Sequence, residues 1–303
     1  GQVLQRGLEQ SMKQLIDIHR DADAHWVGNG FPVRTIFSFQ TLGRAISPFL
    51  MLDYAGPAEF PPSDEPRGVG EHPHRGFETV TIVYQGELEH RDSAGNHGKI
   101  GPGDVQWMTA ASGVVHEEWH EQAFTRRGGV LEMVQLWVNL PAKHKMSPPR
   151  YQEILNAQIP VVPLAGGGLA RVIAGEFAAA TGPAKTFTPV TLLDLRLPAG
   201  GHAELALRDG HTALVLVLKG KALINGAEQA GEAELAVFDR AGERVNIAAE
   251  EDATVLLLAG EPIDEPVVSS GPFVMNTEDE IRQAIQDYRS GRMGRIIARR
   301  AAR

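Results

Sequence analysis

The chain has 303 residues, enough for two ordinary domains, and its 33 glycines and 19 prolines favour many turns over long helices. It has no cysteine, which excludes disulfides, thiolate metal sites and cysteine nucleophiles, and which is typical of a cytoplasmic protein. A formal net charge of −9 argues against direct nucleic-acid binding, and neither a signal peptide nor an apolar run of the roughly 18 residues that span a membrane is expected.

The first half of the sequence predicts one helix followed by strands. Apolar residues at helical spacing within residues 3–16 predict a short amphipathic helix at the start. Alternating and β-branched residues then predict strands, punctuated by glycine and proline turns. The expected strands lie within residues 33–53, 77–89, 105–108 and 130–140, with a turn at 92–96.

The second half repeats this strand pattern. A proline-rich stretch at residues 141–149 leads from one half to the other, so we expect domains at residues 1–160 and 161–291. Strands are expected at residues 190–197, at 213–218 and near Leu235 and Val255, with a hairpin turn at Asn225-Gly226.

The C-terminal segment predicts a helix and then a basic tail. Thr277 and Glu280 form a capping box, apolar residues follow at helical spacing, and Gly291 can end the helix. Residues 292–303 are arginine-rich, so they either lie on an acidic surface or stay disordered, and we expect disorder.

Two pairs of metal-ligand residues stand out in the first half. His72 and His74 form one pair, and His116 and Glu118 form the other, each spaced by one residue in a strand-like segment. Residues i and i+2 of a strand face the same side, so each pair presents both side chains to one surface, whereas Glu117 faces away. If the two strands are neighbours, three imidazoles and one carboxylate converge on a first-row metal ion and leave positions open for further ligands.

Each candidate also has a plainer interpretation, because a single histidine is more often a core or surface residue than a ligand. His120 continues the spacing of the second pair and is a rival ligand, although we expect it behind the ligands or at the surface. Glu78 is either a ligand or a hydrogen-bond acceptor for a ligating imidazole. His90, His97 and His144 are expected at the surface or in loops, with His90 as a candidate for the mouth of the cavity.

Five segments of the chain closely resemble the pirin family of two-domain cupins. They are GEHPHRGFETV at 70–80, PGDVQWMTA at 102–110, QLWVNL at 135–140, the Pro-x-Tyr-Gln of 149–152, and GPFVMNT at 271–277. The resemblance implies an all-β fold of two barrels packed face to face, with short N- and C-terminal helices. It also implies an iron held by His72, His74, His116 and Glu118 in the first barrel, and a degenerate second barrel.

An alignment of residues 84–86 with 218–220 by eye suggests that the halves arose by duplication. The alignment brings Gly113 near Gly242. The second half would then share the fold but lack the metal. In this alignment Ala206, Arg208, Val245 and Ile247 replace the four proposed ligands.

Three functions are compatible with these features. The first is a mononuclear Fe(II) dioxygenase, as the resemblance implies for some pirins, which cleaves flavonols such as quercetin with dioxygen and releases carbon monoxide. In this function Glu118 takes the flavonol proton. Alternative metals are Ni, Mn, Co, Cu or Zn. The second is a redox-responsive module that binds a protein partner and acts as a co-regulator, which the acidic charge suits. The third is a closed, structural zinc site. A monomer is expected.

Overall fold

The computed structural model describes residue 2 and residues 11–297, and these form two compact units built mainly from strands. Unit 1 contains the part up to Asp23, Ile36–Pro48 and Ala157–Pro262. Unit 2 contains Ala24–Thr35, Phe49–Asn156 and the part from Ile263 onward. The expected domains at residues 1–160 and 161–291 stay a prediction. Within the described residues, no helix is both long and apolar enough to cross a membrane.

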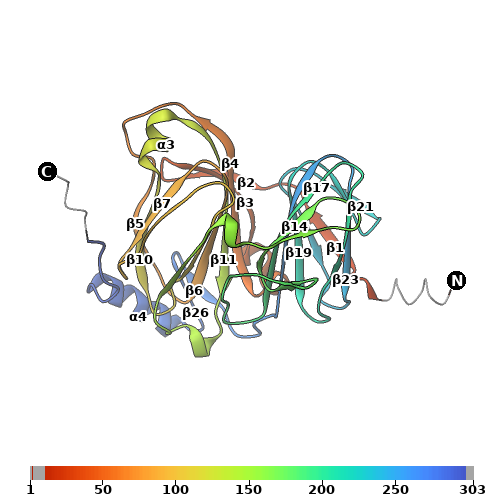
Figure 1. Cartoon of the computed structure of the whole chain (residues 1–303). Coiled ribbons are helices and arrows are strands. Elements are labelled where there is room, and N and C mark those ends of the chain that lie inside the picture. The colour runs from red at the N-terminus through yellow and green to blue at the C-terminus, as the bar shows by residue number, and fades with distance from the viewer. Residues whose placement is uncertain (1, 3–10, 298–303) are drawn as a thin grey trace. The chain divides into compact units, whose positions relative to one another are not determined.

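Unit 2 contains a seven-stranded sheet, in the order β12-β9-β6-β11-β4-β3-β2, and a four-stranded sheet, in the order β5-β10-β7-β8 (Figure 1). Its strands are β2 (Asp23–Val27), β3 (Phe31–Ser38), β4 (Phe49–Phe60), β5 (Gly68–His74), β6 (Phe77–Gln85), β7 (Leu88–Asp92), β8 (His97–Ile100), β9 (Val105–Thr109), β10 (Val114–His120), β11 (Gly129–Asn139) and β12 (Arg150–Ile154). The strands and the turn expected in this half are thus confirmed.

Unit 1 repeats the arrangement, with sheets in the order β1-β22-β19-β24-β17-β14-β13 and β18-β23-β20-β21. Its strands are β1 (Leu15–His19), β13 (Val161–Pro163), β14 (Leu169–Ala174), β17 (Val190–Leu197), β18 (His202–Ala206), β19 (Thr212–Lys219), β20 (Ala222–Ile224), β21 (Glu228–Ala230), β22 (Glu234–Phe238), β23 (Arg244–Ala249) and β24 (Ala253–Gly260), beside a hairpin of β15 (Glu176–Phe177) and β16 (Ala180–Thr181). Matched in chain order, the two units have the same strand order, so the expectation that the second half shares the fold of the first is confirmed. Only β1 departs, since it comes from the N-terminus to the place that β12 has in unit 2.

The interior of unit 1 is filled by aliphatic side chains where the other unit has its histidines. Val245 and Ile247 on β23 are buried in the core cluster of this unit. The pairing of β18 with β23 sets Leu205 opposite Val245, whereas β5 sets His72 opposite His116. The expected equivalence of His72 with Ala206 is therefore wrong by one residue, and because side chains alternate, the buried position belongs to Leu205.

The helices are short except for the last one. They are α2 (Phe39–Leu42), α3 (Gln122–Arg127), the 3₁₀ turns Gly43–Ile46, Ala142–His144 and Asn156–Gln158, and α4 (Glu278–Arg289) after the hairpin β25 (Val268–Ser270) and β26 (Phe273–Met275). Thr277 accepts a hydrogen bond from the Glu280 backbone N–H, so the predicted C-terminal helix and its cap are confirmed.

Two expectations at the termini differ from the structure. The end of the expected N-terminal helix is wrong, because Leu15 and Ile16 belong to strand β1; the part before Ser11 lies outside the described residues. The beginning of the basic tail is not disordered, since Met293 is buried against Val115. The apolar side chain of Met293 explains why this part of the tail packs within unit 2. The arginine-rich composition of residues 292–303 gave no indication of it.

Candidate metal centre

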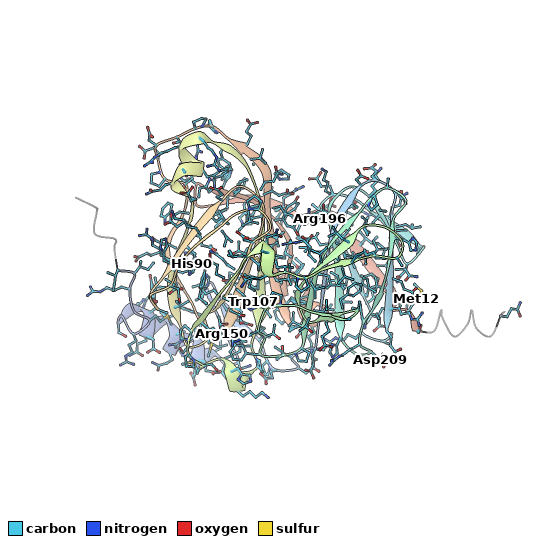
Figure 2. All side chains as sticks on the ribbon, in the orientation of Figure 1. Met12, His90, Trp107, Arg150, Arg196 and Asp209 are labelled. Carbon is cyan, nitrogen blue, oxygen red and sulfur yellow. The ribbon has the colours of Figure 1, made fainter. Side chains whose placement is uncertain are left out.

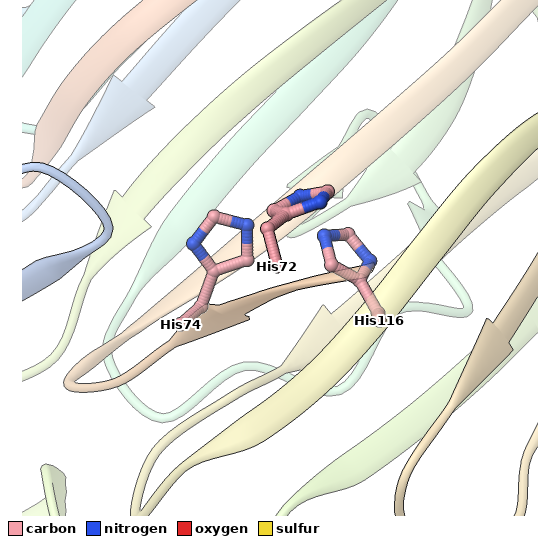
Figure 3. Close-up of side chains that lie close together, drawn as sticks. All are labelled: His72, His74 and His116. Carbon is pink, nitrogen blue, oxygen red and sulfur yellow. The ribbon is translucent and has the colours of Figure 1, made fainter. Parts of the chain in front are cut away.

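The two predicted ligand strands are neighbours, and three of the four predicted ligands converge. Strands β5 and β10 pair with His116 opposite His72. Ligand nitrogens of His72, His74 and His116 all lie within 4.8 Å of one another, and the three rings point toward a shared point (Figure 3). The pairing skips a residue of β5 between the partners of His116 and Glu118, and such bulges re-aim side chains near functional sites.

Hydrogen bonds and burial leave the imidazoles ready to bind a cation. His72 Nδ1 donates to the Gly70 carbonyl oxygen at 2.8 Å, which leaves Nε2 with its lone pair. His74 Nε2 and both ring nitrogens of His116 are buried and have no hydrogen-bond partner among the described residues. Buried polar atoms are almost always partnered, so these nitrogens indicate a ligand at this point.

The lowered pKa values of His74 and His116 also favour metal binding. Burial, followed by the neighbouring His72, lowers the pKa of His74 to about 3. Burial also lowers the pKa of His116 well below its usual value, and the nearby His74 lowers it further. Neutral imidazoles are the form that coordinates metal, so the pH-dependent cost of deprotonation is small here.

Glu118 lies on the same buried face but outside the three-histidine cluster. Gln135 on β11 donates from Nε2 to both carboxylate oxygens of Glu118, at 2.9 and 3.2 Å. Trp137, two residues further on, donates to the Gln135 side-chain oxygen at 3.3 Å and packs edge-on against the ring of His74. Gln135 and Trp137 were missed by sequence reasoning as site residues, although their i, i+2 spacing on a strand places them on one face.

Successive side chains of β10 point to opposite faces of the strand, as predicted. Glu117 and Trp119 line a groove with Glu89 and Arg91, whereas His116 and Glu118 are buried. The sequence prediction that Glu117 points away from the ligands is thus confirmed.

His120 is buried too, but not at the cluster. Its Nε2 donates to the Gly30 carbonyl oxygen at 2.7 Å, and its ring packs against those of Phe31, Phe60 and Phe124. It is therefore a core residue and not a surface one.

Glu78 takes neither of the two roles expected for it. Its carboxyl on β6 accepts a hydrogen bond from the Thr109 hydroxyl, and the side chain is fully buried. Burial raises the pKa of Glu78 to about 7, against the opposing effect of the Thr109 hydrogen bond. The folded protein therefore retains a proton here that the unfolded chain releases near pH 4.5.

A pH-dependent stability follows from Glu78. Because its pKa is raised in the folded state, its contribution is fully present below about pH 4.5 and is lost as the pH rises to about 7. Wild-type protein should therefore lose about 3 kcal/mol of its free energy of unfolding between these pH values, and we expect Glu78→Gln, whose side chain stays neutral, not to show this loss. Urea unfolding of both proteins from pH 4.5 to 7.5 measures this, and equal slopes of stability against pH would contradict it.

Two units with the same strand orders, one of them with a histidine cluster on the inner face of its sheets, define a two-domain cupin. The pirin family model matches residues 30–138, and the model of the pirin C-terminal cupin domain matches residues 192–294. The chain belongs to the pirin family.

Similar proteins cover nearly the whole chain. A Pseudomonas aeruginosa protein named "Putative quercetin 2,3-dioxygenase" is 57% identical over 282 residues, covering 93% of this chain and 98% of that protein. A pirin-like protein of Caulobacter vibrioides is 44% identical over 253 residues, covering 82% and 88%. The crystal structure of a quercetin 2,3-dioxygenase from Acinetobacter baumannii superposes with a TM-score of 0.92 at 49% identity, covering 94% of this chain and 100% of that one.

A more distant likeness shows the fold alone. A bacterial pirin from Escherichia coli, crystallised in complex with nickel(II), superposes with a TM-score of 0.63 at 21% identity and covers 82% of this chain and all of its own.

Proposed function

We propose that the protein is a metal-dependent dioxygenase that cleaves flavonols such as quercetin at the 2,3-bond and releases carbon monoxide. The observation that supports the proposal is the convergence of three imidazoles, of which His74 and His116 are buried with ring nitrogens that have no hydrogen-bond partner among the described residues. The names of the similar Pseudomonas and Acinetobacter proteins support the choice of substrate.

The donor set fits a first-row ion, with Fe(II) as our choice. We propose that His72, His74, His116 and Glu118 would hold it, because imidazole and carboxylate without thiolate suit such ions. When bound, the metal supplies Lewis acidity and an open position at which a flavonol oxygen can lie. The reaction consumes one dioxygen per flavonol, places both oxygen atoms in the cleaved product and releases one carbon as carbon monoxide.

We assign the acceptance of the substrate proton and the orientation of the accepting carboxylate to residues of this chain. Glu118 is the proposed acceptor of the flavonol hydroxyl proton, since it is the carboxylate on the buried face beside His116. Gln135 fixes the orientation of that carboxylate through two hydrogen bonds, and Trp137 fixes Gln135. The aromatic side chains of Phe77 and Trp137 beside His74 limit the access of water.

The test is oxygen uptake and carbon monoxide release by the iron-loaded protein with quercetin. We expect both in a one-to-one ratio, and we expect His72→Ala and Glu118→Ala to remove them. An iron-loaded protein that leaves quercetin unchanged would refute the proposal and favour the alternative of a protein-binding module.

Gln135→Leu tests how Glu118 is held. The change removes the donor to both carboxylate oxygens. We therefore expect metal affinity to fall about 10- to 100-fold, as it does when other residues that hydrogen-bond to a metal ligand are replaced. Competition with a chelator measures the affinity. Gln85→Leu is the matched control, because Gln85 also donates to a carboxylate, that of Glu132, but at an exposed site. Equal affinities of the two variants would count against Glu118 as a ligand.

A further inference from the structure

A second polar group lies beside the histidine cluster on the adjacent strand. In the pairing of β10 with β7, His116 is opposite Asp92 and Glu118 is opposite His90. Directly opposite residues of neighbouring strands face the same side, so His90 and Asp92 share the buried face with the proposed ligands. The ring centroids of His90 and His116 are 5.4 Å apart. The expectation that His90 lies at the surface or in a loop is therefore wrong, since it is a buried residue of unit 2 (Figure 2).

Asp92 fixes which nitrogen of His90 carries the proton. His90 Nε2 lies 2.8 Å from Asp92 Oδ2, and the other carboxylate oxygen accepts hydrogen bonds from the backbone N–H groups of Ala94 and Asn96 and from the Asn96 amide. A carboxylate oxygen accepts, so Nε2–H of His90 donates to Asp92, and in this tautomer of the imidazole Nδ1 carries a lone pair.

In the described part of the chain the side-chain hydrogen bond of His90 runs through Nε2, and this bond to Asp92 holds the ring in its orientation. Tyr151 on β12 stacks on the His90 ring, with centroids 4.8 Å apart and an interplanar angle of 14°. Gly98, which pairs with His90 on β8, makes room for the phenol, because a Cβ there would lie 2.0 Å from the Tyr151 hydroxyl oxygen. That hydroxyl is itself buried and lies near Gln106 without the geometry of a hydrogen bond.

This arrangement is suited to one kind of ligand. Stacked aromatic rings offer a flat apolar wall, and the lone pair of His90 Nδ1 and the Tyr151 hydroxyl add an acceptor and a donor. A planar aromatic molecule that carries hydroxyl groups matches both features. We propose that His90 is a substrate-positioning residue that accepts a hydrogen bond from a hydroxyl of the aromatic substrate, and that Asp92 positions His90. The role given to His90 rests on the proposed function and adds a specificity determinant to it.

The experiment compares three variants with two ligands. His90→Phe keeps an aromatic ring of similar size but removes the acceptor, His90→Gln restores an acceptor, and Asp92→Asn replaces the acceptor that holds Nε2–H. Anaerobic binding of quercetin and of 3-hydroxyflavone, which keeps only the hydroxyl of the central ring, is measured on metal-loaded protein. We expect His90→Phe to weaken quercetin binding about 10- to 100-fold, with Asp92→Asn in between and His90→Gln closer to the wild type.

The metal content and the steady-state constants separate positioning from a structural effect. We expect every variant to retain its metal and the loss to appear in KM more than in kcat. A parallel loss for both flavonols assigns the bond to the central-ring hydroxyl, and a loss for quercetin alone assigns it to an outer hydroxyl. His97→Phe, at an exposed histidine on the neighbouring β8, is the control for the substitution itself.

Two results would overturn the inference. One is unchanged binding of both flavonols by His90→Phe, and the other is a loss of binding that only follows a loss of metal in all three variants. The failure of the proposed function looks different, since wild-type protein would then neither bind nor cleave quercetin, whatever stands at position 90.

Discussion

His116→Ala is expected to abolish stoichiometric metal binding and, with it, flavonol turnover. Loss of a residue that hydrogen-bonds to a metal ligand lowers metal affinity up to about 100-fold. We expect a larger loss of affinity here, because the change removes a proposed coordinating group itself. His116 is the central member of the cluster, since its ring centroid lies 4.3 Å from that of His72 and 4.8 Å from that of His74. Without it, the two remaining imidazoles come from one strand only.

The same variant has a readout that does not depend on catalysis. Metal that binds only the folded state raises its stability by mass action, so the wild-type midpoint of thermal unfolding should rise with added metal and that of His116→Ala should not. Without metal, we expect the two proteins to differ by about 1 kcal/mol or less, because both nitrogens of the deleted ring are buried without a partner. His25→Ala, at an exposed histidine of β2, is the control, and an equal metal-induced shift in His116→Ala would contradict the site.

The sequence was sufficient to predict that the two residues of each proposed ligand pair share one face, because the spacing of residues along a strand fixes the side to which they point. His72 and His74, and likewise His116 and Glu118, needed only the period of two and the assumption that their strands pair. The groups around them depend on which strands become neighbours, and β11 and β7 bring Gln135 and His90 to the site from other parts of the chain. Such pairing is set by tertiary packing, which no local pattern reveals.

The errors in the fold have the same physical origin. The apolar spacing at Leu15 and Ile16 fits a helix, but edge pairing with β22 makes this segment a strand. Met293 stands among arginines, and a composition typical of a disordered tail hid one side chain that fills the space left by Gly113. In both places a long-range contact overrides a weak local preference.

Asp287→Ala is expected to be strongly destabilising, although Asp287 lies outside the histidine cluster. The carboxylate of Asp287 on α4 accepts a hydrogen bond from Arg75 at 2.9 Å, and only 6% of the Arg75 side chain is exposed. Removing one partner of a buried ion pair leaves the other charge uncompensated, which costs about 3–5 kcal/mol. Arg75 also donates to the Ser112 carbonyl oxygen, so the pair links α4 to the segment directly after His74.

Urea unfolding of Asp287→Ala measures the loss, and Asp279→Ala is the matched control. Asp279 lies on the same helix and pairs with Arg282, but both side chains are exposed, so its replacement should cost under about 1 kcal/mol. If the two aspartate variants have the same free energy of unfolding, the buried ion pair does not stabilise the packing of α4.

The helix packs by its apolar face as well, which gives a second way to separate charge from packing. Ile281 and Ala284 of α4 form a cluster with Val115, the neighbour of the proposed ligand His116 on β10. Replacing both charges by apolar residues, as in Arg75→Met with Asp287→Leu, should therefore recover at least half of the stability lost in Asp287→Ala. Metal affinity should follow the same order, because the segments that hold His74 and His116 are the ones that α4 covers.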